Sequence, residues 1–145
     1  MIKKINIIGL LLLVIFMIMS SICLASQEIP NLVGHWKVKV EGATLIRDKN
    51  IGKSAHFGDE NQTTLEAEAD ITRQKGRVIY GTFKSSRATE QFVGVIGHDN
   101  KSMYYADEDG YDDCKIINND TMEIVYRHVT PQQTTVAIGK WTRMK

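Results

Sequence analysis

The feature that most constrains the fold is a two-residue alternation of apolar and polar side chains, which recurs from Val33 to the end of the chain. The clearest stretch is residues 65–72, where four apolar residues alternate with three acidic residues and a threonine. A period of two places the apolar side chains on one face of a β-strand, whereas an amphipathic helix has a period of 3.6. A sheet with one apolar and one ionised face is antiparallel. The sequence therefore predicts an all-β protein.

The alternation is interrupted by turn residues about every ten positions, which is typical of a meander rather than of crossover helices. Asp109-Gly110, for example, predicts a two-residue hairpin turn. We therefore predict an eight-stranded antiparallel up-and-down β-barrel, which at this size either packs solid or holds one small ligand. The strands are expected at 35–41, 65–72, 77–84, 89–97, 101–107, 111–117, 121–129 and 134–144.

One connection, residues 42–63, is much longer than the others. Connections of this length in compact domains are usually functional or disordered. We expect this one to form a flap over one end of the barrel, with a short strand or a helical turn at 44–46. His56 lies in this connection and His98 in a turn, and both are expected at the surface.

The first 25 residues have the composition of a signal peptide. Lys3 and Lys4 precede an apolar run at 5–19, and small residues lead to Ala25. About 15 apolar residues are too few for a membrane span, which needs roughly 20. We predict a cleaved signal peptide at 1–25 and one domain at 26–145, secreted or periplasmic, without a stable membrane span. An uncleaved anchor and a lipoprotein are the alternatives, and Ile22 before Cys23 disfavours the second.

The charge of the mature domain limits the classes of partner it can bind, and its cysteine content limits how it is stabilised. Removal of Lys3 and Lys4 leaves 16 basic residues against 17 acidic ones, a formal charge of about −1. This balance argues against nucleic acid as a partner. Only Cys114 remains after cleavage, so no internal disulfide can form and the domain depends on its core for stability. Cys114 is predicted to be a small buried residue.

No pattern nominates a catalytic, metal or cofactor site, and we predict a protein that is not an enzyme. The acidic run 107–113 resembles a calcium loop, but Ile116 stands where such a loop needs a glutamate. We interpret the run as a solvated hairpin tip, with weak calcium binding as the alternative. The four histidines have no metal-like spacing. Ser85-Ser86 lies in a predicted turn without a recognisable base.

The two ends of the domain resemble the calycin group, which contains the lipocalins and avidin-like barrels. Asn31 to Trp36, with its Gly34-x-Trp36 motif, resembles the start of a lipocalin, and Gly139 to Lys145 resembles the closing strand of an avidin-like barrel. The resemblance implies that Trp36 plugs the closed end and that Arg143 lies across its ring. The lipocalin disulfide and C-terminal helix are absent, and biotin binding is not expected.

The predicted interior leaves two hypotheses open. If Trp36 points inward, residues 38 and 40 do so too. Inward-facing residues are also expected at 65, 67, 69 and 71 and at 122, 124, 126 and 128, because the opposite choice buries carboxylates. For the third and fourth strands the alternation fits either face. Small residues leave a mid-barrel cavity for an apolar ligand, or they only relieve crowding. The ligand-binding candidates are Ala67, Ala69, Phe83, Phe92, Tyr105 and Tyr126.

Two function classes follow from this architecture. The first is a secreted protein that binds a small apolar molecule inside its barrel. The alternative is a protein-interaction or inhibitor module that acts through the loops at the barrel rim.

Overall fold

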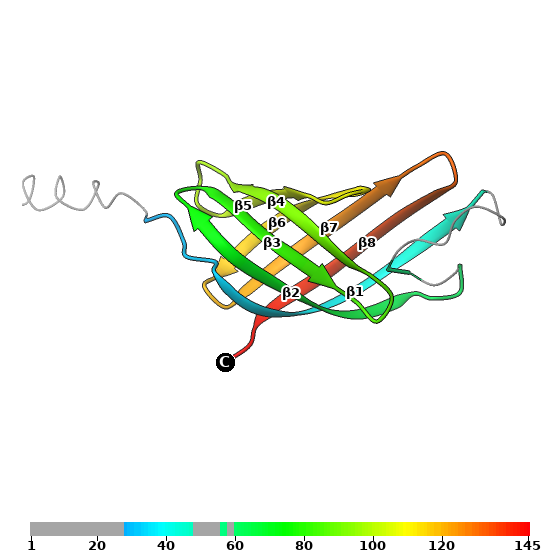
Figure 1. Ribbon diagram of the computed structural model, residues 1–145, viewed down its shortest axis with the longest axis horizontal. Coiled ribbons are helices and arrows are strands. Elements are labelled where there is room, and N and C mark those ends of the chain that lie inside the picture. The colour runs from blue at the N-terminus through cyan, green and yellow to red at the C-terminus, as the bar shows by residue number, and fades with distance from the viewer. Residues whose placement is uncertain (1–27, 48–55, 58–59) are drawn as a thin grey trace, which may run out of the picture.

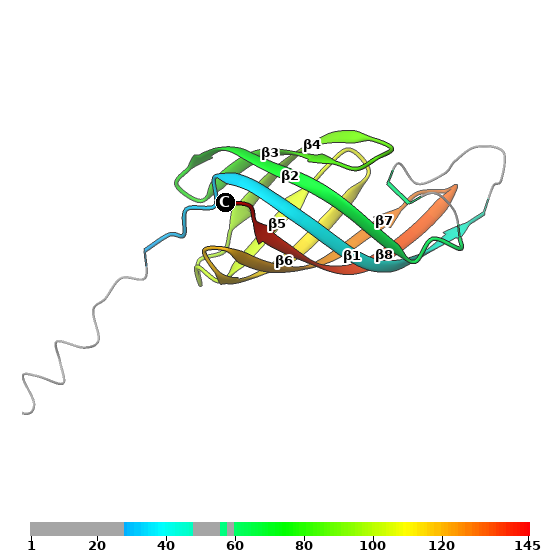
Figure 2. The same ribbon diagram turned by 90° about the horizontal axis from the view of Figure 1, so that it is seen from below.

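The protein is a closed antiparallel barrel in which each strand pairs with its neighbours in the sequence (Figures 1 and 2). The computed structural model describes residues 28–47, 56–57 and 60–145. The predicted signal peptide lies outside these residues, as does part of the long connection. The strands are β1 (Gly34–Ile46), β2 (Thr64–Lys75), β3 (Val78–Lys84), β4 (Thr89–Ile96), β5 (Ser102–Ala106), β6 (Gly110–Asn118), β7 (Thr121–Val129) and β8 (Gln133–Arg143).

The first and last strands close the barrel. β1 pairs with β8 from Trp36 opposite Arg143 to Ile46 opposite Gln133. The predicted eight-stranded antiparallel barrel is thus confirmed, and it fits a calycin-like fold in general. β1 is longer than predicted, because residues 44–46 continue the strand and pair with β8 instead of forming a separate element. Among the described residues, no helix has the length and apolar character needed to cross a bilayer.

The two ends of the barrel differ in what covers them. We call the end that carries the turns 85–88, 107–109 and 130–132 the mouth; residues 56–57 of the long connection also lie there. The other end, which we call the closed end, carries the turns 76–77, 97–101 and 119–120 and the segment 28–33. The C-terminus also lies at the closed end (Figures 1 and 2).

The strands whose orientation the sequence left open are fixed by burial. Ile79, Gly81 and Phe83 of β3 point inward, whereas Val78 is 41% exposed. This choice keeps two large apolar side chains in the core and leaves Lys84 in water. On β4 the inward set includes Phe92 together with Glu90, Gly94 and Ile96.

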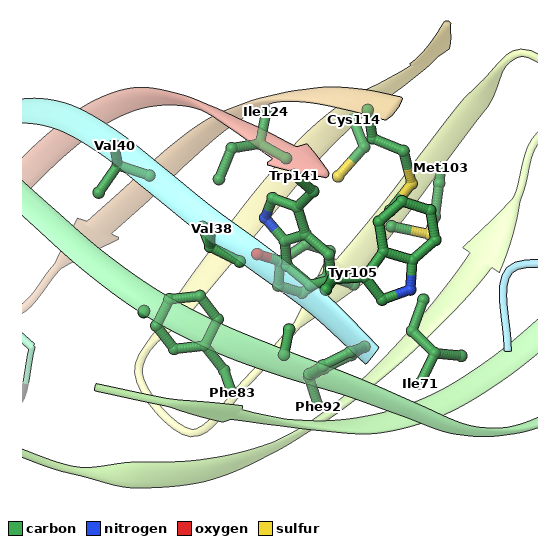
Figure 3. Close-up of a cluster of buried hydrophobic side chains, with 14 of the residues drawn as sticks. Val38, Val40, Ile71, Phe83, Phe92, Met103, Tyr105, Cys114, Ile124 and Trp141 are labelled. Carbon is green, nitrogen blue, oxygen red and sulfur yellow. The ribbon is translucent and has the colours of Figure 1, made fainter. Parts of the chain in front are cut away.

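Trp141 lies at the centre of the core, surrounded by four aromatic side chains (Figure 3). Its ring centroid is 5.6 Å from that of Tyr105 and 6.0 Å from that of Phe92. A methyl group on Gly81 would collide with the Phe92 ring, so that glycine makes room for an aromatic ring and leaves no space for a ligand. Around Trp141 the core is therefore packed with aromatic rings, which favours the second of the two hypotheses for that part of the barrel.

The closed end is sealed by the segment before β1. Leu32 is fully buried, and the Trp36 indole Nε1 donates a hydrogen bond to its carbonyl oxygen at 3.1 Å. The Gln74 side chain accepts a hydrogen bond from the Leu32 amide and donates one to the Pro30 carbonyl, both at 2.9 Å. These bonds satisfy backbone groups that the seal would otherwise bury without partners.

Candidate functional site

Polar side chains are buried only toward the mouth, among the residues that the structure describes. The half around Trp36 and Trp141 is apolar, with Ile71, Met103 and Met122 fully buried or nearly so. Burying polar groups costs free energy unless each finds a partner, so their collection at one end requires an explanation. The buried polar residues are Thr44, His56, Ser85, Glu90, Asp112, His128, Gln133 and Thr135.

A small, partly open cavity lies between this polar end and the apolar core. Its volume is about 30 Å³, enough for about one or two water molecules. One wall carries acidic side chains, and the rest is apolar or aromatic. The lining residues are Val40, His56, Phe57, Leu65, Phe83, Tyr105, Asp107, Asp112, Ile124, Tyr126 and Ala137.

His56 and Phe57 of the long connection occupy the mouth, with 5% and 2% of their surfaces exposed. The His56 ring packs edge-on against Phe83, with centroids 4.8 Å apart. Its Nδ1 lies 2.9 Å from the Ser85 hydroxyl, and its Nε2 lies 3.0 Å from the Glu90 carboxyl group. The expectation of a surface histidine is therefore wrong. Two polar partners inside the mouth compensate for the burial of the ring.

Ser85, His56 and Glu90 stand in the order of a hydrolytic triad, which the sequence analysis missed because it found no base for Ser85. The Ser85 hydroxyl, however, faces Nδ1 rather than Nε2, and its oxygen already accepts hydrogen bonds from the Arg87 and Ala88 amides. Ser85 also does not line the cavity. This geometry fits an anchor that holds His56 against the β3–β4 turn.

The acidic run after β5 faces the mouth, and only part of it is a solvated hairpin tip. Asp107 accepts hydrogen bonds from the amides of Asp109 and Gly110, so the turn spans three residues instead of the predicted Asp109-Gly110 pair. The Asp109 carboxylate accepts a hydrogen bond from the Tyr126 hydroxyl at 3.3 Å and lies 3.0 Å from Nδ1 of His128. Glu108 is exposed, as a solvated tip requires.

Asp112 is the buried group at the mouth whose loss of contact with water is least offset by hydrogen bonds. It is 2% exposed, and neither of its carboxyl oxygens has a hydrogen bond of normal geometry to a described residue. Burial raises the pKa of Asp112 to about 8, and the nearby Tyr105 hydroxyl opposes that rise. Burial also raises the pKa of Glu90, against the influence of His56.

Oxygen atoms of Glu90, Asp107 and Asp109 lie within 4.8 Å of one another, so these three residues have the spacing of cation ligands. Carboxylates of this kind bind hard cations such as Ca²⁺ when six to eight oxygens surround the ion. When ionised, these three carboxyl groups attract positive charge to the mouth.

Three of the six ligand-binding candidates, Phe83, Tyr105 and Tyr126, line the cavity. Phe92 packs beside Trp141 in the filled part of the core. Ala67 and Ala69 are buried but do not line the cavity. Whether any of the six contacts a ligand stays a prediction.

The three residues assigned to barrel closure meet at the closed end. The Arg143 guanidinium carbon lies 4.3 Å from the centre of the Trp36 ring. Its nitrogens donate hydrogen bonds to the carbonyls of Val33, at 2.6 Å, and Asn119. Gly34 has a φ of 146°, and a Cβ there would lie 2.6 Å from an Arg143 nitrogen.

The alternation contained a signal for Asp112 that the sequence analysis did not use. Cys114 and Ile116 point inward, and a period of two then places Asp112 inward as well. No comparable signal exists for His56 and Phe57, because they lie in a connection without periodicity.

Comparison with models of known protein families found no match, and a search of curated proteins found none either. The candidate site is therefore defined by its geometry alone. A closed barrel with an internal cavity at one end is compatible with ligand binding.

Proposed function

We propose that this protein is an exported small-molecule binding protein of the calycin group, which holds one ligand with an apolar body at the mouth of its barrel. The proposal rests on one observation, the separation of a filled apolar half from a mouth with buried polar groups and a cavity. A purely structural core avoids buried polar groups, because incompletely satisfied ones cost stability. Ligand sites combine apolar walls with a few placed polar groups.

The ligand takes the space that the Phe57 side chain fills in this structure. The present cavity of about 30 Å³ is far smaller than the roughly 300–1,000 Å³ of small-molecule sites. Phe57 and His56 are joined to the mouth by ring packing and by the bonds to Ser85 and Glu90, and not by a strand. Such contacts are weaker than a β-ladder, so this segment is the part of the mouth that yields most easily.

Two further parts of the proposal rest on the sequence and the site. The basic residues and apolar run before Ala25 support export to the periplasm or the exterior. The engaged lone pairs of Ser85 support binding rather than catalysis. The resemblance of both chain ends to lipocalins and avidin-like barrels supports the calycin assignment.

The test compares uptake of a neutral fluorescent apolar probe, N-phenyl-1-naphthylamine, by the mature protein and by Phe57→Ala. We expect Phe57→Ala to bind the probe about tenfold more tightly, because the truncation opens the site. Tyr104→Ala, which removes a half-exposed ring from the outer face of β5, is the control and should bind like the wild type. Solvent extraction and mass spectrometry of the purified protein should also yield a stoichiometric compound. No probe binding by either protein, with an empty extract, would refute the proposal.

A further inference from the structure

We infer that the ligand at the mouth is an organic cation, with an ammonium group held between Asp112 and Asp107 and an apolar or aromatic body against the rings below. This inference rests on the proposed function, because it names the ligand class for the same cavity. Its argument comes from the charges at the mouth, which apolar ligand binding alone does not require.

The mouth holds more carboxyl groups than it has basic partners for. Four carboxyl groups meet there, and no lysine or arginine is buried among the described residues. Of the basic side chains in the described part of the chain, the imidazoles of His56 and His128 are the ones in contact with these carboxyl groups. The four carboxyl groups belong to Glu90, Asp107, Asp109 and Asp112.

Three of the four carboxyl groups have partners. Glu90 contacts His56, Asp109 contacts Tyr126 and His128, and Asp107 accepts hydrogen bonds from amides of its turn. Asp112 alone, nine-tenths or more buried, has neither oxygen satisfied. A buried carboxyl group without partners costs about 1–3 kcal/mol or more, and a cationic ligand would supply the missing donor.

The guanidinium group of Arg127 makes no hydrogen bond to Asp112. Arg127 of β7 donates a hydrogen bond to Asp113 on the outer face and lies over the Tyr111 ring, with its guanidinium carbon 5.8 Å from the ring centre. Asp112 points the other way and lines the cavity together with Asp107. The unsatisfied oxygens therefore belong to the cavity side of the strand.

The cavity wall fits an organic cation better than a metal ion. Below the His56–Phe57 segment, the rings of Phe83, Tyr105 and Tyr126 line the cavity that Asp107 and Asp112 border. Ammonium groups are attracted both to carboxylates and to aromatic faces. A metal ion at Glu90, Asp107 and Asp109 needs further oxygen ligands, and it would leave Asp112 unpaired because that residue is outside the cluster.

The test uses two probes that differ in one group, 2-phenylethylamine and its neutral counterpart 2-phenylethanol. Binding to the mature protein and to Phe57→Ala is measured at pH 8 by calorimetry or by NMR titration. We expect the amine to bind about tenfold or more tightly than the alcohol, because a buried charge pair discriminates strongly. Asp112→Asn should lose that preference while it binds the alcohol as before. Asp113→Asn removes the same charge from the neighbouring outward position and should keep the preference.

Each result decides between the proposals. Equal binding of both probes overturns the cationic ligand while small-molecule binding stands. An amine preference that survives in Asp112→Asn also overturns the inference, since the charge would then be recognised elsewhere. Thermal stabilisation by CaCl₂ or MnCl₂ without any response to the amine assigns the carboxylates to a metal and overturns it as well. Binding of neither probe by wild type or Phe57→Ala overturns both proposals.

Discussion

At the scale of single residues, Asp112 and Arg143 differ in how their ionisable groups are buried and hydrogen-bonded. Asp112 lies inside the barrel, and Arg143 lies at its closed end. Asp112 is buried without a hydrogen bond of normal geometry, whereas Arg143 keeps a fifth of its side chain exposed and donates hydrogen bonds to several carbonyl oxygens. A buried charge without a partner shifts its pKa instead of staying ionised. The two residues therefore affect stability in opposite directions.

Asp112 should make the protein less stable as the pH rises. Its folded-state pKa is about 8 because of burial, against about 4 in an unfolded chain. Between these values the folded protein holds a proton that the unfolded chain has released. The free energy of unfolding must then fall by several kcal/mol between about pH 4 and pH 8 and level off above. Urea unfolding at pH 5 and pH 8 measures this slope.

Asp112→Asn should remove that part of the slope and raise the stability at pH 8. The raised pKa of Glu90 contributes a slope of the same sign, which the variant retains. Glu123→Gln on β7 serves as the control at an exposed position. An unchanged slope in Asp112→Asn would contradict the assignment. The charged or titratable groups that act on Asp112 are Tyr105 of β5, Asp107 of the turn, Asp113 of β6 and Arg127 of β7.

Arg143→Ala should destabilise the protein by about 2–4 kcal/mol, because it removes a cation–π contact and charged hydrogen bonds at the closed end. Gly34→Ala should also destabilise it, since the new Cβ collides with Arg143 and the positive φ strains an alanine. Denaturant unfolding of the two single variants and of the double variant measures the coupling free energy between positions 34 and 143. If the two residues interact, the double variant is more stable than the sum of the single effects predicts; strict additivity would refute the contact.

At the scale of strands, the small residues of β2 and β3 set how closely large rings approach the barrel axis. Ala69 lies opposite Trp36 of β1 and opposite Phe83 of β3, and 1% of its surface is exposed. Gly81 lies opposite Phe92 of β4. The spaces next to these residues are thus filled by aromatic rings from neighbouring strands.

Ala69→Leu should destabilise the barrel by about 1–3 kcal/mol, because the added methyl groups overpack a filled region. Thr72→Leu, an exposed position on the same strand, is the control and should change stability by less than about 0.5 kcal/mol. Thermal or urea unfolding measures both. A leucine tolerated at position 69 without loss of stability would show that space exists there.

At the scale of the whole molecule, closure through the β1–β8 pairing leaves no edge strand. Edge strands expose unpaired amides, and a barrel removes them. We expect amide hydrogen exchange in β1 and β8 to be as slow as in the central strands β3 and β4, apart from residues near the turns. Exchange followed by NMR tests this. Fast exchange along all of β1 or β8 would indicate an open sheet.

The amino-acid sequence by itself determined the barrel. The two-residue alternation and the regular turns predicted the number of strands, their antiparallel order and most of their boundaries, because inward and outward positions alternate locally along a strand. The inward faces of β2 and β7 followed from the same rule, since the opposite choice would bury carboxylates, and that of β1 followed once Trp36 was placed inside. Cys114 was predicted to be buried and is 5% exposed.

Only the tertiary structure decided what fills the interior and what gathers at the mouth. The Phe92 ring occupies the space that Gly81 leaves, and a sequence does not show which ring enters such a space. His56 and Phe57 reach the mouth from a connection that has no period. Asp112 joins them through the closure of the sheet. Contacts between residues far apart in the chain depend on packing, which no local pattern specifies.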